Sequence, residues 1–299
     1  MKLHHLILAG LLAFSSAFGG NKTPVHGYPL GWVPDAPGQI KAQFSARPEF
    51  DAINIAPKSD LSAGMPGVYD QGALGSCTGN GNLSVFEYAW KKQTGAFMQG
   101  SRLGLYYDER AIDGTIRQDA GSQISTGIKV LTGTGVGLES AWPYNIAKFT
   151  TKPPAAYYTG AQGYQLLKAY NLDNTDHSSI RVALSQGYPV VFGCYVYNAI
   201  EHLTPAHYVL PMPLKGEGPI GGHCMVIVGH DDVLKVYLVR NSWGTGYAHG
   251  GYLLIPYAYL ESGKIADDFW VIMSVKAPPA KIISFPKAAA VKAARKKAA

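Results

Sequence analysis

The chain has 299 residues, which is enough for one large domain or for two smaller ones that share a cleft. Its apolar fraction of 47% and charged fraction of 15% are those of an ordinary globular protein, and beyond the N-terminus no run of about eighteen apolar residues could span a membrane as a helix. Seven of the 26 basic residues lie in residues 276–299, which leaves 19 basic against 20 acidic residues elsewhere, so a nucleic-acid partner is not expected.

Residues 1–19 have the parts of an export signal: a short basic start, an apolar run from Leu6 to Phe14 and then small residues. A buried N-terminal helix is less favoured, because the segment has no polar face at helical spacing. We therefore expect a secreted or extracytoplasmic protein. Residues 20–60 are rich in proline and glycine, and we interpret them as an extended N-terminal arm or short propeptide without the amphipathic pattern of a helical inhibitory one.

The next part of the chain is predicted to be helical. Residues 67–76 form a glycine-punctuated loop, and from Cys77 onward apolar residues return at helical spacing. The same spacing predicts helices over residues 101–112, with Ser101 as a cap, and over residues 122–133. The first half therefore consists mainly of helices.

The second half has a different pattern, with short runs of β-branched and aromatic residues bounded by glycine, proline and aspartate. These runs are residues 188–196, 224–229, 236–240, 251–256 and 269–275. Helices followed by antiparallel strands predict an α+β fold with two subdomains and a cleft between them.

Several residues have the properties that a catalytic cysteine requires: a stabilised thiolate, an oriented base and donors for the developing oxyanion. Cys77 lies where the glycine-rich loop meets a helix, and Gln71 is an uncharged amide donor on the same loop. Far downstream, His223 begins one strand and Asn241 ends another, so the asparagine can orient the imidazole without adding charge. Trp243 can cover that contact and exclude water.

Three blocks carry a resemblance to a known family. They are residues 71–77 (QGALGSC), 222–223 (GH) and 241–247 (NSWGTGY). In this order and spacing they resemble the active-site blocks of the papain family of cysteine peptidases, in the form seen in bacterial and viral members. The block ADDFW at residues 266–270 is similar to the same members, and the resemblance covers roughly residues 60–275.

The resemblance implies a papain-like fold, with a helical left domain (about residues 61–165), an antiparallel, barrel-like right domain (about 166–275) and the active-site cleft between them. It implies a peptidase that acts through an acyl-enzyme intermediate without a cofactor or a metal. The catalytic residues would be Cys77 as the nucleophile, His223 as general base and acid, Asn241 as the orienting residue and Gln71 as the oxyanion donor. Residues implied in substrate binding are Gly121, Ser122, Gly193, Gly222, Cys224 and Trp243.

The partner expected from this resemblance is a protein or peptide substrate, and the chain is expected to be a monomer. With Gly193 and Cys224 beside it, the S2 pocket is expected to be roomy and apolar and to accept Leu, Phe or Val. The Ala/Lys-rich tail 276–299 is expected to be disordered and able to contact anionic surfaces.

The sequence also departs from the family pattern. Thr78 stands where an aromatic residue usually follows the nucleophile, which is expected to alter the S1′ side. Leu74 replaces a cysteine that forms a disulfide in many relatives, so stability must come from packing. Cys194 and Cys224 could form a disulfide or remain thiols, and a metal site that includes His223, Cys224 and His230 is not favoured, because no second pair has zinc-ligand spacing.

Two further functions stay open on the same residues. The first is a catalytically silent papain-like module that binds peptides or surfaces, and the second is an acyltransferase, because the triad sets acyl transfer while the pocket sets the acceptor. Silent relatives usually lack the cysteine, the histidine or the glutamine. All three are present here, which favours activity.

Overall fold

The computed structural model describes residues 27–36, 55–176 and 178–276. The predicted export signal and all but the first residue of the basic tail lie outside these ranges. Within them, no helix has the length and apolar character needed to cross a membrane.

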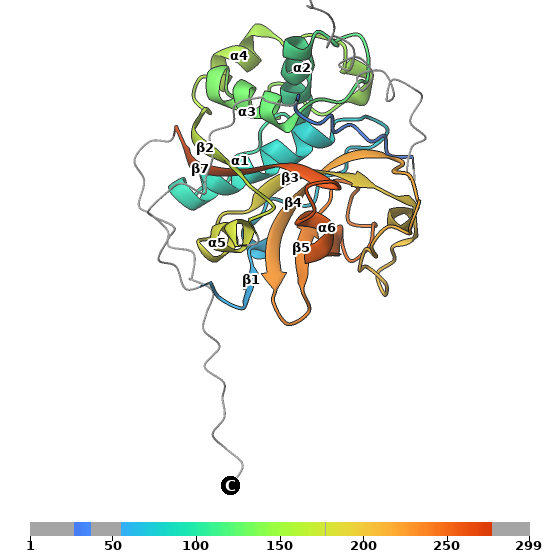
Figure 1. Ribbon diagram of the computed structural model, residues 1–299. Coiled ribbons are helices and arrows are strands. Elements are labelled where there is room, and N and C mark those ends of the chain that lie inside the picture. The colour runs from blue at the N-terminus through green and yellow to red at the C-terminus, as the bar shows by residue number, and fades with distance from the viewer. Residues whose placement is uncertain (1–26, 37–54, 177, 277–299) are drawn as a thin grey trace, which may run out of the picture.

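The helical half is built around α1, and the three helices predicted for this half are confirmed (Figure 1). The helices are α1 (Cys77–Thr94), α2 (Arg102–Asp113), α3 (Ile124–Gly133) and α4 (Ala155–Ala161). The side chain of Ser101 accepts a hydrogen bond from the amide of Gly104, so it caps α2 as expected. The left-handed Gly95, with φ of 77°, ends α1.

The β half is one antiparallel sheet in the order β2-β7-β3-β4-β5-β6, with β1 paired to β4, and it does not close into a ring. Its strands are β1 (Lys58–Asp60), β2 (Leu166–Leu172), β3 (Val190–Val196), β4 (Gly221–Asp231), β5 (Val236–Arg240), β6 (Tyr252–Pro256) and β7 (Ala266–Val275). Short helices complete the fold: α5 (Ser179–Ser185), α6 (Tyr257–Leu260) and the 3-10 turns η2 (Ser62–Gly64), η3 (Ile146–Lys148) and η4 (Asn198–His202). All five predicted strands are present.

Strands β1 and β2 were not predicted. β1 is only three residues long and gains its order by pairing with β4. In β2 the buried and exposed residues do not alternate, because its pairing with β7 shifts register at Lys168. A period of two is therefore absent from its sequence.

A shared core joins the two halves, and α1 lies across it (Figure 1). Apolar side chains of α1, such as Leu83 and Phe86, pack in the same cluster as Val226 of β4 and Trp270 of β7. Burial of this kind is worth about 25 cal/mol per Å² of apolar surface. The start of α1 is consequently held rigidly against the start of β4.

Candidate active site

His223 and Asn241 form a pair on the neighbouring strands β4 and β5. His223 is the third residue of β4, Asn241 directly follows β5, and His223 Nε2 lies 2.7 Å from Asn241 Oδ1. The backbone amide of Ser242 donates to the same Oδ1, also at 2.7 Å, so this atom is the acceptor and Nε2 must carry the hydrogen. In the neutral ring Nδ1 is therefore the unprotonated nitrogen.

Burial sets the charge of this imidazole. His223 is fully buried, and its Nδ1 has no hydrogen-bond partner among the described residues. Burial lowers the pKa of His223 to about 4, while the hydrogen bond that His223 donates to Asn241 acts in the opposite direction. The indole of Trp243 stacks on the ring at 4.7 Å between centroids. In this structure the ring is thus neutral at pH 7.

Cys77 is the first residue of α1, and its side chain is buried. A helix N-terminus favours a thiolate, because the amides of the first turn point toward it. Cys77 packs in one cluster with Cys224, which adjoins His223 on β4. Burial raises the pKa of both Cys194 and Cys224, and a charge on Cys77 raises it further. The three cysteines, all in the described ranges, form no disulfide, so Cys194 and Cys224 are inert thiols.

The side-chain amide of Gln71 is held in one orientation by hydrogen bonds at both of its ends. Its Oε1 accepts from the hydroxyl of Ser242 at 2.7 Å, which leaves Nε2 as the donor. Nε2 donates to the carbonyl of Leu74 at 2.9 Å and to that of Pro29 at 3.0 Å. Ser242 thus orients both Asn241, through its amide, and Gln71, through its hydroxyl. The sequence alone did not indicate this role.

The N-terminal arm occupies the cleft beside these residues. Tyr28 stacks on Trp243 with 5.4 Å between ring centroids, and its hydroxyl donates to the carbonyl of Trp243. The next residue, Pro29, places its carbonyl on Gln71. Leu30 is buried, and a side chain added at Gly221 would meet it.

Beyond Leu30 the arm lies against the predicted substrate-binding glycines. The amide of Ser122 donates to Gly31 O at 2.9 Å, and a Cβ at Gly121 would lie 2.0 Å from the same oxygen. Gly31 has no room for a side chain either, because its Cβ would lie 1.8 Å from Gly75 O. Trp32 N donates to Gly222 O at 3.0 Å.

The Trp32 indole enters a pocket that we call the Trp32 pocket, lined by Gly193, Tyr195, Gly222 and Asp268. A Cβ at Gly193 would lie 2.0 Å from the indole, and a Cβ at Gly222 would lie 2.8 Å from it. The sequence predicted an apolar pocket here from Gly193 and Cys224. The structure adds a carboxylate, because Trp32 Nε1 donates to Asp268 Oδ2 at 3.1 Å.

Thr78 and Leu74 have structural roles. Thr78 is buried, and its hydroxyl donates to Glu109 Oε2 of α2 at 2.7 Å. The Thr78 side chain therefore faces the interior of the helical half, and the effect on the S1′ side stays a prediction. Leu74 is buried in a small cluster with Tyr106 and Trp142, so packing stabilises the loop where a disulfide could have done so.

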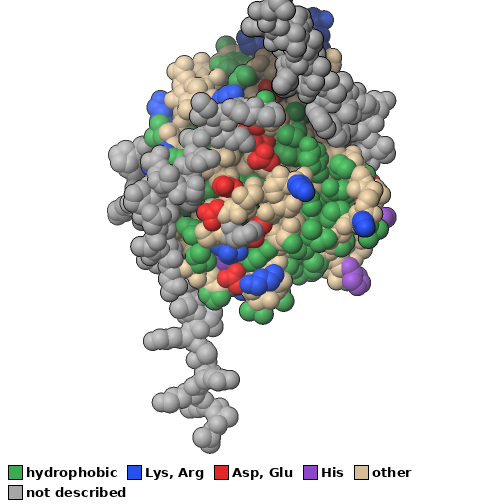
Figure 2. Space-filling view, in the orientation of Figure 1, with side chains coloured by type: hydrophobic (Ala, Val, Ile, Leu, Met, Phe, Trp, Pro, Cys, Tyr) green, Lys and Arg blue, Asp and Glu red, His purple; other side chains and the backbone are tan. Residues whose placement is uncertain are grey.

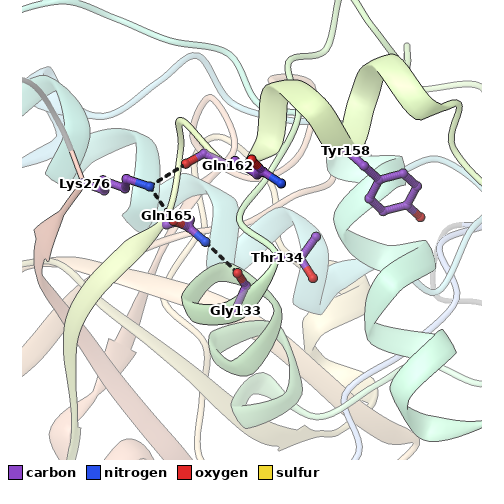
Figure 3. Close-up of a pocket in the computed structure, with 6 residues that line it drawn as sticks. All are labelled: Gly133, Thr134, Tyr158, Gln162, Gln165 and Lys276. Atoms are coloured by element: carbon purple, nitrogen blue, oxygen red, sulfur yellow. Dashed lines mark hydrogen bonds between the residues drawn. The ribbon is translucent and has the colours of Figure 1, made fainter.

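Other parts of the described surface offer little chemistry. Figure 3 shows a pocket at the end of α3, in which Lys276 Nζ donates to Gln162 O and Gln165 Oε1, and Gln165 Nε2 donates to Gly133 O. Its polar groups thus bind one another. On the face in Figure 2, acidic and basic side chains are interspersed. No three His, Cys, Asp or Glu side chains of the described residues converge as metal ligands.

Comparison with known proteins agrees with this geometry. The sequence model of the papain family cysteine proteases matches residues 56–271. A peptidase C1-like protein of Acanthamoeba polyphaga mimivirus is 37% identical over 70% of this chain and 70% of its own, and cysteine proteinase 3 of Entamoeba histolytica is 25% identical over 75% and 67%. Xylellain, a cysteine protease from Xylella fastidiosa, is 33% identical with a TM-score of 0.74, over 82% of this chain and 96% of its own. The chain belongs to the papain family of cysteine proteases, which are hydrolases that act on peptide bonds.

Proposed function

We propose that the chain hydrolyses peptide bonds through Cys77, His223 and Asn241, with Gln71 as the oxyanion donor. The observation that carries the proposal is the 2.7 Å contact from His223 Nε2 to Asn241 Oδ1, because it leaves Nδ1 as the ring nitrogen that can accept a proton. Gln71 Nε2 and the Cys77 amide would receive the oxyanion.

The reaction follows from these positions. His223 Nδ1 takes the thiol proton, and the sulfur of Cys77 attacks the carbonyl carbon of the substrate. The C–N bond breaks as His223 returns the proton to the leaving amine, which leaves a thioester on Cys77. Water then loses a proton to His223 and attacks the thioester, and the acid product and the thiol are released. Asn241 keeps the ring oriented throughout.

We further propose that the docked arm keeps the enzyme latent. The carbonyl of Pro29 accepts from Gln71 Nε2, the donor that a substrate oxyanion needs. Tyr28 and Trp32 cover the two sides of the site. With the arm docked His223 is fully buried, which disfavours the imidazolium that would stabilise a thiolate. Release of the arm hydrates the ring and exposes the cleft.

The direction in which the arm runs through the cleft would protect it from cleavage by the enzyme. Trp32 and Ser122 form a parallel bridge, in which Ser122 N donates to Gly31 O and Val33 N donates to Ser122 O. The residues that follow Pro29 fill the pocket that, by the resemblance, holds the residues preceding the scissile bond of a substrate. The arm therefore runs through the cleft in the direction opposite to that of a substrate. If the bond after Pro29 broke, the leaving amine would lie in this pocket and not on the side of Trp243.

The catalytic proposal is tested by labelling the full chain with an epoxysuccinyl thiol inhibitor and locating the label by mass. Stoichiometric labelling of Cys77, lost in Cys77→Ala and in His223→Ala, is the expected result. Peptide hydrolysis measured alongside separates a hydrolase from an acyltransferase. Absence of labelling in an arm-weakened variant would favour the silent binding module.

Latency is tested with Trp32→Ala, which removes the indole from its pocket and the hydrogen bond to Asp268. Because loss of a buried aromatic costs about 3–5 kcal/mol, we expect Cys77 to be labelled at least about tenfold faster than in the wild type. Phe97→Ala is the control, since Phe97 is an exposed aromatic on a loop of the helical half. Equal labelling rates in the wild type and Trp32→Ala would show that the arm does not limit access.

A further inference from the structure

The walls of the Trp32 pocket suit a large flat side chain. Gly193 and Gly222 contribute no side chains, and both are in close contact with the indole. The ring of Tyr195 meets the indole edge-on, with 5.5 Å between centroids. The pocket adjoins the candidate catalytic pair, because Gly222 directly precedes His223 in β4. It is therefore placed to select a substrate side chain close to the scissile bond.

The floor of this pocket is a buried carboxylate. Asp268 is 0% exposed, and its Oδ2 accepts from Trp32 Nε1 at 3.1 Å and from the amide of Asp35 at 3.2 Å. Both donors belong to the arm. The carboxyl of Asp267 accepts from the Asp268 amide at 2.7 Å and so supports the left-handed backbone at Asp268, where φ is 57°. Such a conformation is uncommon outside glycine and marks a side chain held in a particular direction.

We propose that Asp268 is a specificity-determining residue, which makes the enzyme prefer arginine in the substrate residue that occupies the Trp32 pocket. By the resemblance this is the second residue before the scissile bond, P2. The inference rests on the proposed peptidase function. When the arm leaves, the carboxylate loses two donors that it has while buried, and this loss costs free energy unless a substrate replaces them.

Arginine replaces what the arm supplies. Its guanidinium is planar like the indole, offers parallel N–H donors to one carboxylate and adds the opposite charge. It can also stack against Tyr195, as guanidinium groups do on aromatic rings. Leucine or phenylalanine would fill the glycine-walled space but would supply no donor to Asp268. The apolar preference expected from Gly193 and Cys224 alone is therefore reversed by the carboxylate.

The test uses the full chain with Trp32→Ala, so that the pocket is open, and fluorogenic peptides that differ only at P2, with arginine, leucine or phenylalanine. We expect kcat/KM for arginine to exceed that for leucine by about tenfold or more, and we expect Asp268→Asn to reduce this arginine-to-leucine ratio to about two or less. Asp176→Asn is the matched control, because Asp176 is an exposed aspartate in the turn before α5, away from the Trp32 pocket. A preference for leucine or phenylalanine that Asp268→Asn leaves unchanged would overturn the inference.

A second measurement separates this inference from the catalytic proposal. In Trp32→Ala with Cys77→Ala, calorimetry measures the binding of uncleaved peptides with arginine or leucine at P2. Binding that favours arginine and requires Asp268 supports the pocket assignment even if Cys77 is never labelled, in which case only the catalytic proposal fails. Labelling of Cys77 together with binding that favours leucine leaves the catalytic proposal intact and overturns the assignment of Asp268.

Discussion

At the scale of single residues, the state of His223 depends on its surroundings more than on its own chemistry. A histidine has a pKa of about 6.5 in water, and burial, in part under Trp243, lowers that of His223 to about 4. The unfolded chain therefore binds the proton more readily than the folded one. The stabilising contribution of the neutral ring is complete above pH 6.5 and is lost as the pH falls toward 4.

This linkage predicts how the stability of the folded protein changes at acid pH. From pH 7 to pH 4.5, the free energy of unfolding of the wild type should fall by about 2 kcal/mol more than that of His223→Gln, which cannot be protonated. Denaturant unfolding at both values measures the difference. If the two proteins lost stability in parallel, the folded protein would have to accommodate the charged ring, and burial of His223 would not contribute to latency.

At the scale of elements, a buried carboxyl links α1 to α2. Glu109 of α2 is fully buried and accepts from Thr78 Oγ1 and, at 3.3 Å, from Asn82 Nδ2, both on α1. Burial raises the pKa of Glu109 to about 8, against an ordinary value of 4.5. The folded protein thus retains a proton that the unfolded chain releases, and this contribution to stability is lost as the pH rises through this window.

Glu109→Gln should remove that dependence, because glutamine stays neutral and keeps an acceptor. Between pH 5 and pH 8 we expect the wild type to lose on the order of 3 kcal/mol relative to the variant, a slope of about 1.4 kcal/mol per pH unit over most of the window. Chemical denaturation across this range measures it. Parallel pH profiles would mean that Glu109 is ionised in the folded protein and that α1 and α2 are held together in another way.

At the scale of the whole molecule, Arg240 of β5 connects the two halves. Its guanidinium donates to the hydroxyl of Ser84 on α1 and to the carbonyl of Gly67 on the loop before α1, and it lies over the ring of Tyr69 at 4.9 Å. Arg240 is buried, so these donors have no water to replace their partners.

Arg240→Met should therefore destabilise both halves together. We expect a loss of about 3 kcal/mol, or about 6–12 °C in Tm for a chain of this size, within a single calorimetric transition. Arg181→Met is the comparison, because the ion pairs of Arg181 with Asp232 and Glu261 lie within the β half and it should cost less. Two separate transitions would show that the halves fold independently.

The sequence by itself determined the helices from Cys77 onward, the main strands and the catalytic candidates. These features depend on local periodicity and on residue types in a fixed order, which the chain shows directly. The export signal and the basic tail stay predictions.

Only the tertiary structure decided what faces the cleft. The residues of the docked arm form neither a helix nor one of the sheet strands, so nothing local to residues 27–36 marks them as occupants of the site. Asp268 is similarly one of two adjacent aspartates, and its backbone conformation and the pairing of β7 with β3 decide that it, and not Asp267, is the buried one. Contacts between segments more than two hundred residues apart arise from packing, which has no local pattern in the sequence.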